Sequence, residues 1–465
     1  MMQTSKKAKT YALLITCGAS FIPPFFANAL NLAIPQIAVT FGSETAEVAW
    51  VMNAFLLVAA GVMLPLGRLS DIIGRKKLFL PGLLIFSISS FLCAYAWSIE
   101  WLIVFRALQG VGSALIFGTA VAILISVFPP EERGKALGFI SAVVYLGLSL
   151  GPAAGGFITY NWGWPAIFLI SGAVNLIIFV LALTQLKGEW LGTPGEPFDW
   201  QGSILYFVGL AAFLYGLSSL HGHWAAWFIV LGGLLLLFLF VRRELSTDYP
   251  ILPLHLLKKN RMFAYSNLVA LLSYIANFAP LFLMSLYLQS VLNFDPRRAG
   301  FMLLIQPIVM VIISPFAGRL SDRKNPHSVS LLGMIICTLS LSLFIFIGLN
   351  TPIYFTAANL VLLGVGFGLF ATPNNNAIMG SIEKKYYGMA ASSLGSMRLS
   401  GQSISMALAT LALGHFVGSV ELALAPPDRL AAGIRVSFAV FAIVCTFGVI
   451  VAIKRNKIGK QTVTD

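Results

Sequence analysis

The 465-residue chain contains little charge: Asp, Glu, Lys and Arg make up 10% of it, whereas 58% of its residues are hydrophobic. Soluble domains carry about 25% charged residues, so this chain cannot cover a water-facing surface of its size. We therefore expect one polytopic protein embedded in a lipid bilayer rather than several soluble domains. Lysine and arginine outnumber aspartate and glutamate 30 to 17, but they concentrate in short loops between apolar runs. This pattern is typical of membrane topology and argues against a nucleic-acid partner.

The chain also lacks the residue clusters of enzymes and metal proteins. Its four cysteines lie singly inside apolar runs, and its five histidines form no recognisable metal cluster. We therefore expect no metal site, no cofactor and no enzymatic activity. A G-x-x-x-x-G-K-[ST] loop for nucleotide phosphates is absent as well, which disfavours transport driven by ATP.

Acidic residues are missing from the apolar segments. Each of the 17 aspartates and glutamates falls in a loop or at a predicted helix end. Arg106 and Arg398 are the formal charges that we place inside segments, and Arg435, near the start of segment 430–453, is counted with the outer side. A buried positive charge at low dielectric repels cations, so we expect permanent dications to be poor ligands.

A membrane-spanning helix needs roughly 20 mostly apolar residues, and the sequence contains fourteen such segments. They are 11–39, 48–66, 78–97, 101–128, 136–160, 164–186, 202–220, 224–241, 262–292, 299–316, 328–349, 352–379, 389–417 and 430–453. Six precede residue 187 and six begin at residue 262. We therefore predict an all-α membrane protein with two six-helix bundles, 1–186 and 262–465, joined by a linker (187–261) that holds two inserted helices.

The loops predict the orientation of the chain. With a cytoplasmic N-terminus, 24 of the 30 lysines and arginines fall on the cytoplasmic side and 4 on the outer side. Cytoplasmic loops of membrane proteins carry such an excess. We therefore expect an integral protein of the cell membrane with both termini in the cytoplasm.

A pentapeptide occurs twice, about half a chain apart, each time on a short charged hairpin between apolar segments: Gly67–Asp71 and Gly318–Asp322 both read GRLSD. Matching hydropathy on both sides indicates an internal duplication. The first copy continues through Gly74 and Arg75. Asp71 and Arg75 are four residues apart, the favourable order for an acid–base pair on a helix, and we expect them to form a latch on the cytoplasmic side.

Two further motifs lie inside predicted helices. The fourth segment contains Arg106 and Gly110 in the pattern R-x-x-Q-G. An arginine there costs about 2.5–3.5 kcal/mol on insertion scales, so it should face a water-filled cavity or a partner, unless it extends outward to the membrane surface. In the fifth segment, Gly147, Gly151 and Gly155 share one face, which lets a neighbouring backbone approach, and Pro152 should kink the helix.

Together these motifs resemble those of the major facilitator superfamily (MFS). The run from Gly67 through Gly74 and Arg75 resembles its loop signature, although Ile72 replaces the usual basic residue and the second copy lacks the later glycine. R-x-x-Q-G-x-G resembles its fourth-helix motif, and g-x-x-x-G-P-x-x-G-G the antiporter signature of its exporters. Over essentially the whole chain, the resemblance narrows to the fourteen-helix drug/proton antiporter family, which includes multidrug and tetracycline exporters. Its motifs are matched by Asn31–Pro35, Phe198–Gly202, Tyr287–Gln289, Gly364–Gly368 with Pro373-Asn374, and Arg398–Gly401. One departure stands out: Phe26 occupies a position where many of these exporters have aspartate.

The resemblance implies a secondary active exporter of hydrophobic or amphipathic small molecules, coupled to protons and working as a monomer by alternating access. An uncoupled or symporting carrier of a specific metabolite or lipid is the alternative, since it would explain the missing carboxylates. A channel or membrane-embedded enzyme is disfavoured, because no filter-like loop or intramembrane His/Asp/Glu cluster is present. Helix-end carboxylates, Asp71 first, would have to carry any proton coupling.

Polar residues inside the apolar segments are candidates for a substrate cavity. They are Asn28, Asn31, Tyr274, Asn277, Gln306, Asn374, Arg398 and Gln402. Tyr274 with Asn277, and Arg398 with Gln402, share a helix face by their spacing of three and four residues. For any one asparagine the alternative is a hydrogen bond between helices, worth roughly 0.6 kcal/mol on average.

Overall fold

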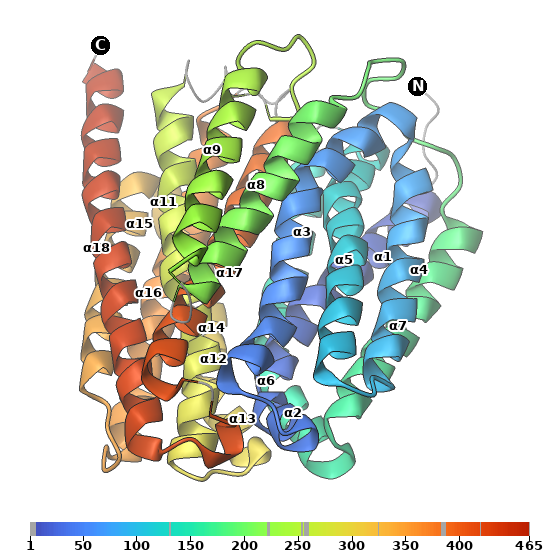
Figure 1. The fold of residues 1–465 in the computed structure, drawn as a ribbon. Coiled ribbons are helices and arrows are strands. Elements are labelled where there is room, and N and C mark those ends of the chain that lie inside the picture. Colours follow the sequence, from blue (N-terminus) through green and yellow to red (C-terminus); the bar gives the residue numbers. More distant parts are fainter. Residues whose placement is uncertain are drawn as a thin grey trace.

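The computed structural model describes residues 6–129, 132–220, 224–252, 254, 260–323, 325–382, 387–418 and 420–464. Within these ranges the regular secondary structure is helical, apart from one isolated antiparallel bridge between Glu44 and Glu421. The helices run side by side, and both ends of the chain lie at the same end of the bundle (Figure 1). We call this the termini end, and the opposite one the distal end.

The first half of the chain contains seven helices that form six spans. They are α1 (Lys6–Leu30), α2 (Ile34–Phe41), α3 (Thr45–Ile73), α4 (Arg75–Ala94), α5 (Ile99–Val127), α6 (Arg133–Trp162) and α7 (Trp164–Gln185). The pentapeptide Gly67–Asp71 belongs to the last turns of α3, so our placement of it on a hairpin was wrong. The turn between α3 and α4 is confined to Gly74, whose φ of 128° favours glycine.

Two inserted helices follow, α8 (Trp200–Ser219) and α9 (Ala226–Glu244), shown in green in Figure 1. They pack against each other, and α8 also contacts α3 of the first half and α17 of the second half. The inserted pair therefore bridges the two halves.

The second half begins with α11 (Arg261–Asn277), α12 (Ala279–Leu286) and a π-helical turn, η1 (Tyr287–Val291), which form one broken span. It continues with α13 (Pro296–Leu303), α14 (Ile305–Arg323), α15 (Pro326–Leu343), α16 (Ile353–Gly380), α17 (Tyr387–Val417) and α18 (Pro427–Thr464). Short 3₁₀ turns, η2 (Phe344–Phe346) and η4 (Leu422–Leu424), precede α16 and α18.

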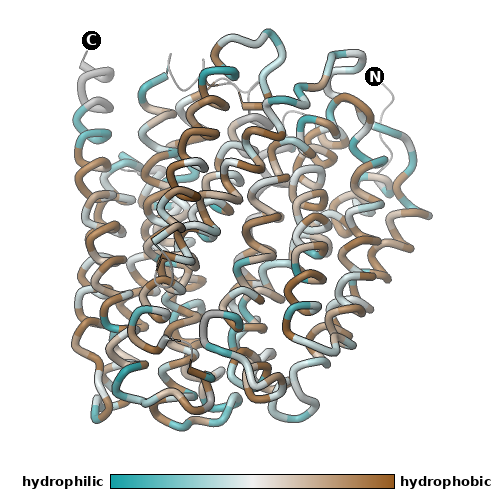
Figure 2. The backbone as a smooth tube through the Cα atoms, in the orientation of Figure 1, coloured by the Kyte–Doolittle hydropathy of each residue, from teal (hydrophilic) through white to brown (hydrophobic). Residues whose placement is uncertain are grey.

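Thirteen helical spans among the described residues are long and apolar enough to cross a membrane. The 31-residue helix α17 is also long enough, but its serines, Arg398 and Gln402 make it more polar. With α17 the helices correspond to the fourteen predicted segments. Figure 2 shows hydrophobic residues along the helices and hydrophilic ones gathered mainly at the two ends.

Proline breaks the first span near the distal end. Pro35 cannot donate a hydrogen bond to the carbonyl of Asn31 four residues earlier, and the chain turns between α1 and α2. The Ser285 hydroxyl, from α12 in the other half, donates to that Asn31 carbonyl oxygen at 2.6 Å. The freed carbonyl is thereby satisfied, and the two halves are joined at this point.

Other contacts between the halves also lie toward the distal end. The Leu422 amide donates to the Ser43 carbonyl oxygen at 3.2 Å, beside the bridge between Glu44 and Glu421. The Asn53 amide donates to the Thr410 hydroxyl at 3.0 Å. The distal ends of the two halves are therefore packed together in this structure.

Candidate functional site

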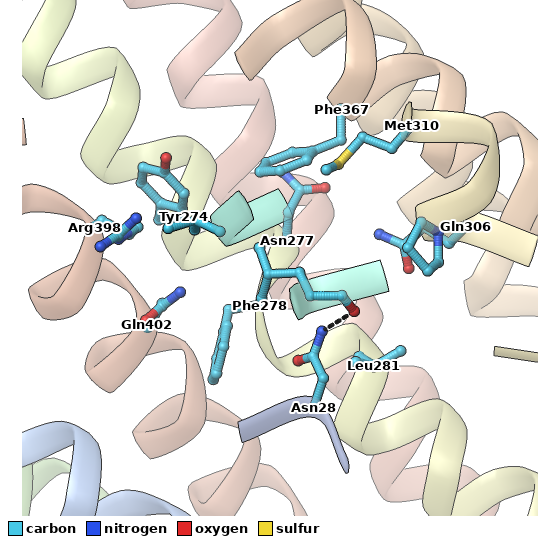
Figure 3. A pocket seen from close by; sticks show the side chains of 13 residues that line it. Asn28, Tyr274, Asn277, Phe278, Leu281, Gln306, Met310, Phe367, Arg398 and Gln402 are labelled. Carbon is cyan, nitrogen blue, oxygen red and sulfur yellow. Dashed lines mark hydrogen bonds between the residues drawn. The ribbon is translucent and has the colours of Figure 1, made fainter. Parts of the chain in front are cut away.

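A cavity lies between the two halves. The first half contributes α1 and α6, and the second half contributes the α11–α12 break, α14, α16 and α17. The lining residues are Asn28, Val144, Leu148, Tyr274, Asn277, Phe278, Leu281, Gln306, Pro307, Met310, Phe367, Arg398 and Gln402. Figure 3 shows their side chains converging from these helices.

The cavity joins aromatic walls to neutral polar groups and one cation. Tyr274 and Phe367 make an edge-to-face pair with ring centroids 6.2 Å apart. The Arg398 guanidinium lies 5.0 Å from the centre of the Phe117 ring, a cation–π contact with α5. Among the described residues, no aspartate or glutamate lines the cavity. The site therefore suits an aromatic or amphipathic ligand that is neutral or negatively charged.

Asn28 of α1 and Asn277 at the end of α11 are two polar residues of the cavity lining. The Asn28 side chain donates to the Leu148 carbonyl oxygen at 2.8 Å, the dashed line in Figure 3. Asn277 is the last residue of α11, and Pro280 follows at the start of α12. Its amide donates to the Ser273 carbonyl oxygen at 2.9 Å, while its own side-chain oxygen is buried without a protein partner. That oxygen remains available to a ligand donor.

Six of the eight predicted cavity residues line this cavity, and two do not. Asn31 lies at the α1–α2 break and is 2% exposed. Asn374 is 1% exposed, and its side-chain oxygen accepts a hydrogen bond of 2.6 Å from Arg455. Our placement of these two residues in the cavity was wrong, because hydropathy does not reveal which face of a helix meets another helix.

Arg455 is a buried charge that lies two residues beyond the last predicted segment, 430–453. It lies inside α18 because that helix continues beyond the predicted end at residue 453. Its guanidinium donates to Asn374 and to the Ser330 hydroxyl, and its side chain is 0% exposed. No carboxylate forms an ion pair with it among the described residues. Neutral polar groups hold this cation in the packed second half.

Arg106 lies in the packed interior of the first half rather than on the cavity. Its Nε donates to the Val51 carbonyl oxygen at 2.9 Å, and Nη1 donates to Gln109. The guanidinium faces the rings of Phe55 and Phe26, 4.2 and 5.1 Å from their centres. Phe26 therefore supplies a cation–π contact at the position where the resembling exporters have aspartate.

Glycines in α5 and α6 allow close contacts between helices, both within the first half and between the two halves. A Cβ on Gly110 would lie 2.6 Å from the Phe55 carbonyl oxygen of α3, and one on Gly151 would lie 2.7 Å from the Phe25 carbonyl oxygen of α1. Both glycines therefore bring helices of the first half together. Gly156 differs, because it abuts Pro296 and Gly300 of α13 in the second half. Pro152 also faces that helix, since a Cβ on Gly300 would lie 2.7 Å from its carbonyl oxygen.

The predicted latch residues, Asp71 and Arg75, form an ion pair at the termini end. Asp71 Oδ1 accepts from Nε and Nη2 of Arg75 at 2.8 and 2.7 Å. Arg75 also donates to the Ala122 carbonyl oxygen at 3.0 Å and to the Ser126 hydroxyl of α5. The pair thereby joins three successive helices, α3, α4 and α5.

The connector between α7 and α8 packs onto this latch. The amides of Gly192 and Thr193 donate to the Asp71 carbonyl oxygen at 2.8 and 3.0 Å. The Glu189 carboxylate accepts from the Lys76 and Lys77 amides at 2.8 and 3.1 Å, so it caps the N-terminus of α4. A Cβ on Gly74 would lie 2.7 Å from the Glu189 carboxyl carbon, a second reason for glycine at this turn.

Gly318, the first residue of the second pentapeptide copy, is not closely packed against a neighbouring helix. A Cβ on Gly318 would have only ordinary contact, 3.6 Å, with Thr372. The side chain of Asp322 lies outside the described residues, and no latch is assigned to this copy.

We expect Asp71→Asn to lower transport several-fold while leaving folding nearly intact. The Asp71 and Arg75 side chains are 33% and 16% exposed, and partly exposed ion pairs contribute about 1 kcal/mol or less to stability. Transport rate per molecule and thermal unfolding midpoint would be measured together. Glu132→Gln is the matched control, because Glu132 pairs with Lys9 at the same end outside the latch. Wild-type transport by the Asp71 variant would rule the latch out.

Comparisons with known proteins agree with this architecture. A sequence model of the Major Facilitator Superfamily matches residues 16–199, 198–406 and 266–464. Together these matches run from residue 16 to residue 464. The chain is 31% identical over 410 residues to the riboflavin transporter RibZ of Clostridioides difficile (strain 630), and this alignment covers 88% of each chain.

Two further relatives carry resistance names. Multidrug resistance protein B homolog of Mycobacterium tuberculosis is 29% identical over 88% of this chain and 78% of its own length. Methyl viologen resistance protein SmvA of Salmonella typhimurium is 29% identical over 78% of this chain and 77% of its own length. Among solved structures, a bacterial homolog of the human lysosomal transporter Spinster aligns with a TM-score of 0.71 over 97% of this chain and 98% of its own. At 14% identity this likeness concerns the fold alone.

Proposed function

Because the chain belongs to the Major Facilitator Superfamily, whose members are transporters rather than enzymes, we propose that it exports hydrophobic or amphipathic small molecules in exchange for protons. It is an integral membrane protein, and the finer proposal concerns direction, coupling and substrate. The two halves would alternately open the central cavity to either side of the membrane. We propose further that residues 1–186 and 262–465 are the moving bundles, that the termini end is cytoplasmic, and that the monomer is the working unit.

The observation that carries this proposal is the cavity at the boundary between the halves. It combines Tyr274, Phe278 and Phe367 with neutral hydrogen-bonding groups such as Gln306 and Gln402. Ligand sites of this kind are mainly apolar with a few polar groups that orient the ligand. The name of one relative, multidrug resistance protein B homolog, supports export of such compounds.

A carrier of one specific metabolite is the second candidate. The sequence identity of 31% to a protein named riboflavin transporter favours this second candidate. Flavins are planar, aromatic and rich in hydrogen-bonding atoms, which suits the mixed lining of this cavity. A metabolite carrier and a drug exporter would differ in selectivity and in their response to a proton gradient.

Purified protein in lipid vesicles would test the proposal. Vesicles would be loaded with a fluorescent amphiphilic dye or with riboflavin, and a pH gradient imposed. Movement of several unrelated dyes against their gradients, opposite to proton flow, is the expected result. Movement of riboflavin alone would favour the metabolite carrier, and transport only down a gradient would exclude proton coupling.

A further inference from the structure

The inserted pair contains two buried carboxyl groups at its termini end. Glu244, the last residue of α9, is 3% exposed, and its Oε2 accepts a hydrogen bond of 2.7 Å from the Leu252 amide. Its other oxygen, Oε1, is buried without a hydrogen-bond partner. Asp199, the N-cap residue of α8, is 7% exposed.

Gly202 allows the two carboxyl groups to approach each other. A Cβ on Gly202 would collide with the Asp199 carboxylate and would lie 3.1 Å from Glu244 Oε1. Both groups therefore flank the same backbone position, and the unpartnered oxygen of Glu244 points toward it. This accounts for the glycine of the Phe198–Gly202 motif, which the transport cavity does not use.

The charges at this site do not balance if both carboxyl groups are ionised. Arg243 donates to Asp199 through Nε at 2.9 Å and through Nη2 at 2.8 Å. Burial alone raises the pKa of Asp199, but hydrogen bonds from Arg243 and the Gly202 amide outweigh it and hold that pKa below its usual range. Asp199 and Arg243 are also the charged groups that act on Glu244. One cation already pairs with Asp199, so a second negative charge would be buried with only backbone amides and the shared Arg243 to stabilise it, which is costly.

We propose that Glu244 is a proton-binding site through which the inserted pair responds to pH. When it is protonated, the Glu244 carboxyl group is neutral, and its Oε2 accepts the hydrogen bond from the Leu252 amide. Loss of the proton places a second negative charge beside Asp199 and favours entry of water at this end of α9.

The packing around Leu252 connects this site to both halves. Ile251 and Leu252 belong to one apolar cluster with Met63 of α3 and Leu399 of α17. Within the same cluster, the Tyr206 hydroxyl of α8 donates to the Ala60 carbonyl oxygen of α3 at 3.3 Å. Water entry at Glu244 would loosen this cluster, and α3 and α17 would move more freely relative to α8. Only this last step, the effect on transport, rests on the proposed function.

Infrared spectroscopy of the purified protein tests proton binding without any substrate. Wild type at neutral pH should show the C=O stretching band of a protonated carboxyl group, and the band should disappear as the pH is raised. The band should be absent from Glu244→Gln and unchanged in Asp248→Asn, the control, because Asp248 is exposed nearby in the chain. A wild type without the band, or a Glu244→Gln variant that retains it, would overturn the assignment.

Stability and transport give two further readouts. The wild-type unfolding midpoint should fall as the pH rises and Glu244 ionises, because an acid stabilised in its protonated form weakens the fold when it loses its proton. Glu244→Gln, which stays neutral, should lack that fall. In vesicles, the same variant should show a transport rate that depends less on pH than the wild-type rate. If the unfolding midpoints of the wild type and Glu244→Gln fell equally as the pH rises, the proton site would be overturned. If only the stability of the variant, and not its transport rate, lost its pH dependence, the link between the site and transport would be overturned.

Discussion

Gly156→Val should slow transport by about fivefold to a hundredfold, because it overpacks the contact between the two halves. Any Cβ at this position would collide with the Pro296 carbonyl oxygen and lie 3.2 Å from the Gly300 Cα, both in the opposite half. Backbone atoms cannot rotate away, so α6 and α13 must separate. Overpacking of this kind costs about 1–3 kcal/mol, and each 1.4 kcal/mol changes a population about tenfold. The state with a packed distal end would be depleted.

The measurement combines transport rate with accessibility of the cavity. In Gly156→Val, a cysteine placed at Gln306 should react faster with a membrane-impermeant thiol reagent added on the distal side. The reciprocal variant Gly300→Val should behave alike, since its Cβ would meet the Pro152 carbonyl oxygen at 2.7 Å. Gly232→Val is the control, because a Cβ there has no atom within 4 Å. Wild-type transport in both Gly156→Val and Gly300→Val would show that the distal contact does not open during the cycle.

The sequence predicts these helices well because apolar length is a local property. Fourteen segments, two halves and an inserted pair all follow from runs of hydrophobic residues and the charges between them. Apolar length does not reveal which helix each glycine packs against. Gly151 and Gly156 are both part of one motif, yet the first packs within its own half and the second against the other half. That distinction depends on the rotation of α6 relative to its neighbours.

Buried charges mark a second limit of prediction. Arg455 was placed outside the last predicted segment because hydropathy falls near residue 453, but α18 continues and carries it inside. Glu244 was likewise placed outside the apolar segments, but the chain at Leu252 folds back onto it and α8 packs beside it. Phe26 could be recognised as a departure from the resembling exporters, but its contact with Arg106 required the positions of two helices that are far apart in sequence.

Arg398 should set the charge preference of the transporter, so a dicationic substrate should be moved far more slowly than a neutral one of similar size. No described carboxylate lines the cavity to offset this guanidinium. A unit charge about 8 Å from it is repelled by about 2 kcal/mol at an effective dielectric constant of 20. This corresponds to roughly thirtyfold for each positive charge, at about 1.4 kcal/mol per tenfold change. Neutral, zwitterionic or anionic amphiphiles should therefore be the better substrates.

Arg398→Gln tests this explanation, because it removes the charge and keeps a hydrogen-bonding side chain. In vesicles, transport of methyl viologen, a dication, would be compared with that of a neutral aromatic dye. The ratio of the two rates should rise at least tenfold in Arg398→Gln and stay unchanged in Arg297→Gln, which removes an exposed arginine away from the cavity. Fast, proton-dependent export of methyl viologen by the wild type would contradict the prediction. The aromatic faces of Tyr274 and Phe367 would then have to attract the cation more strongly than Arg398 repels it.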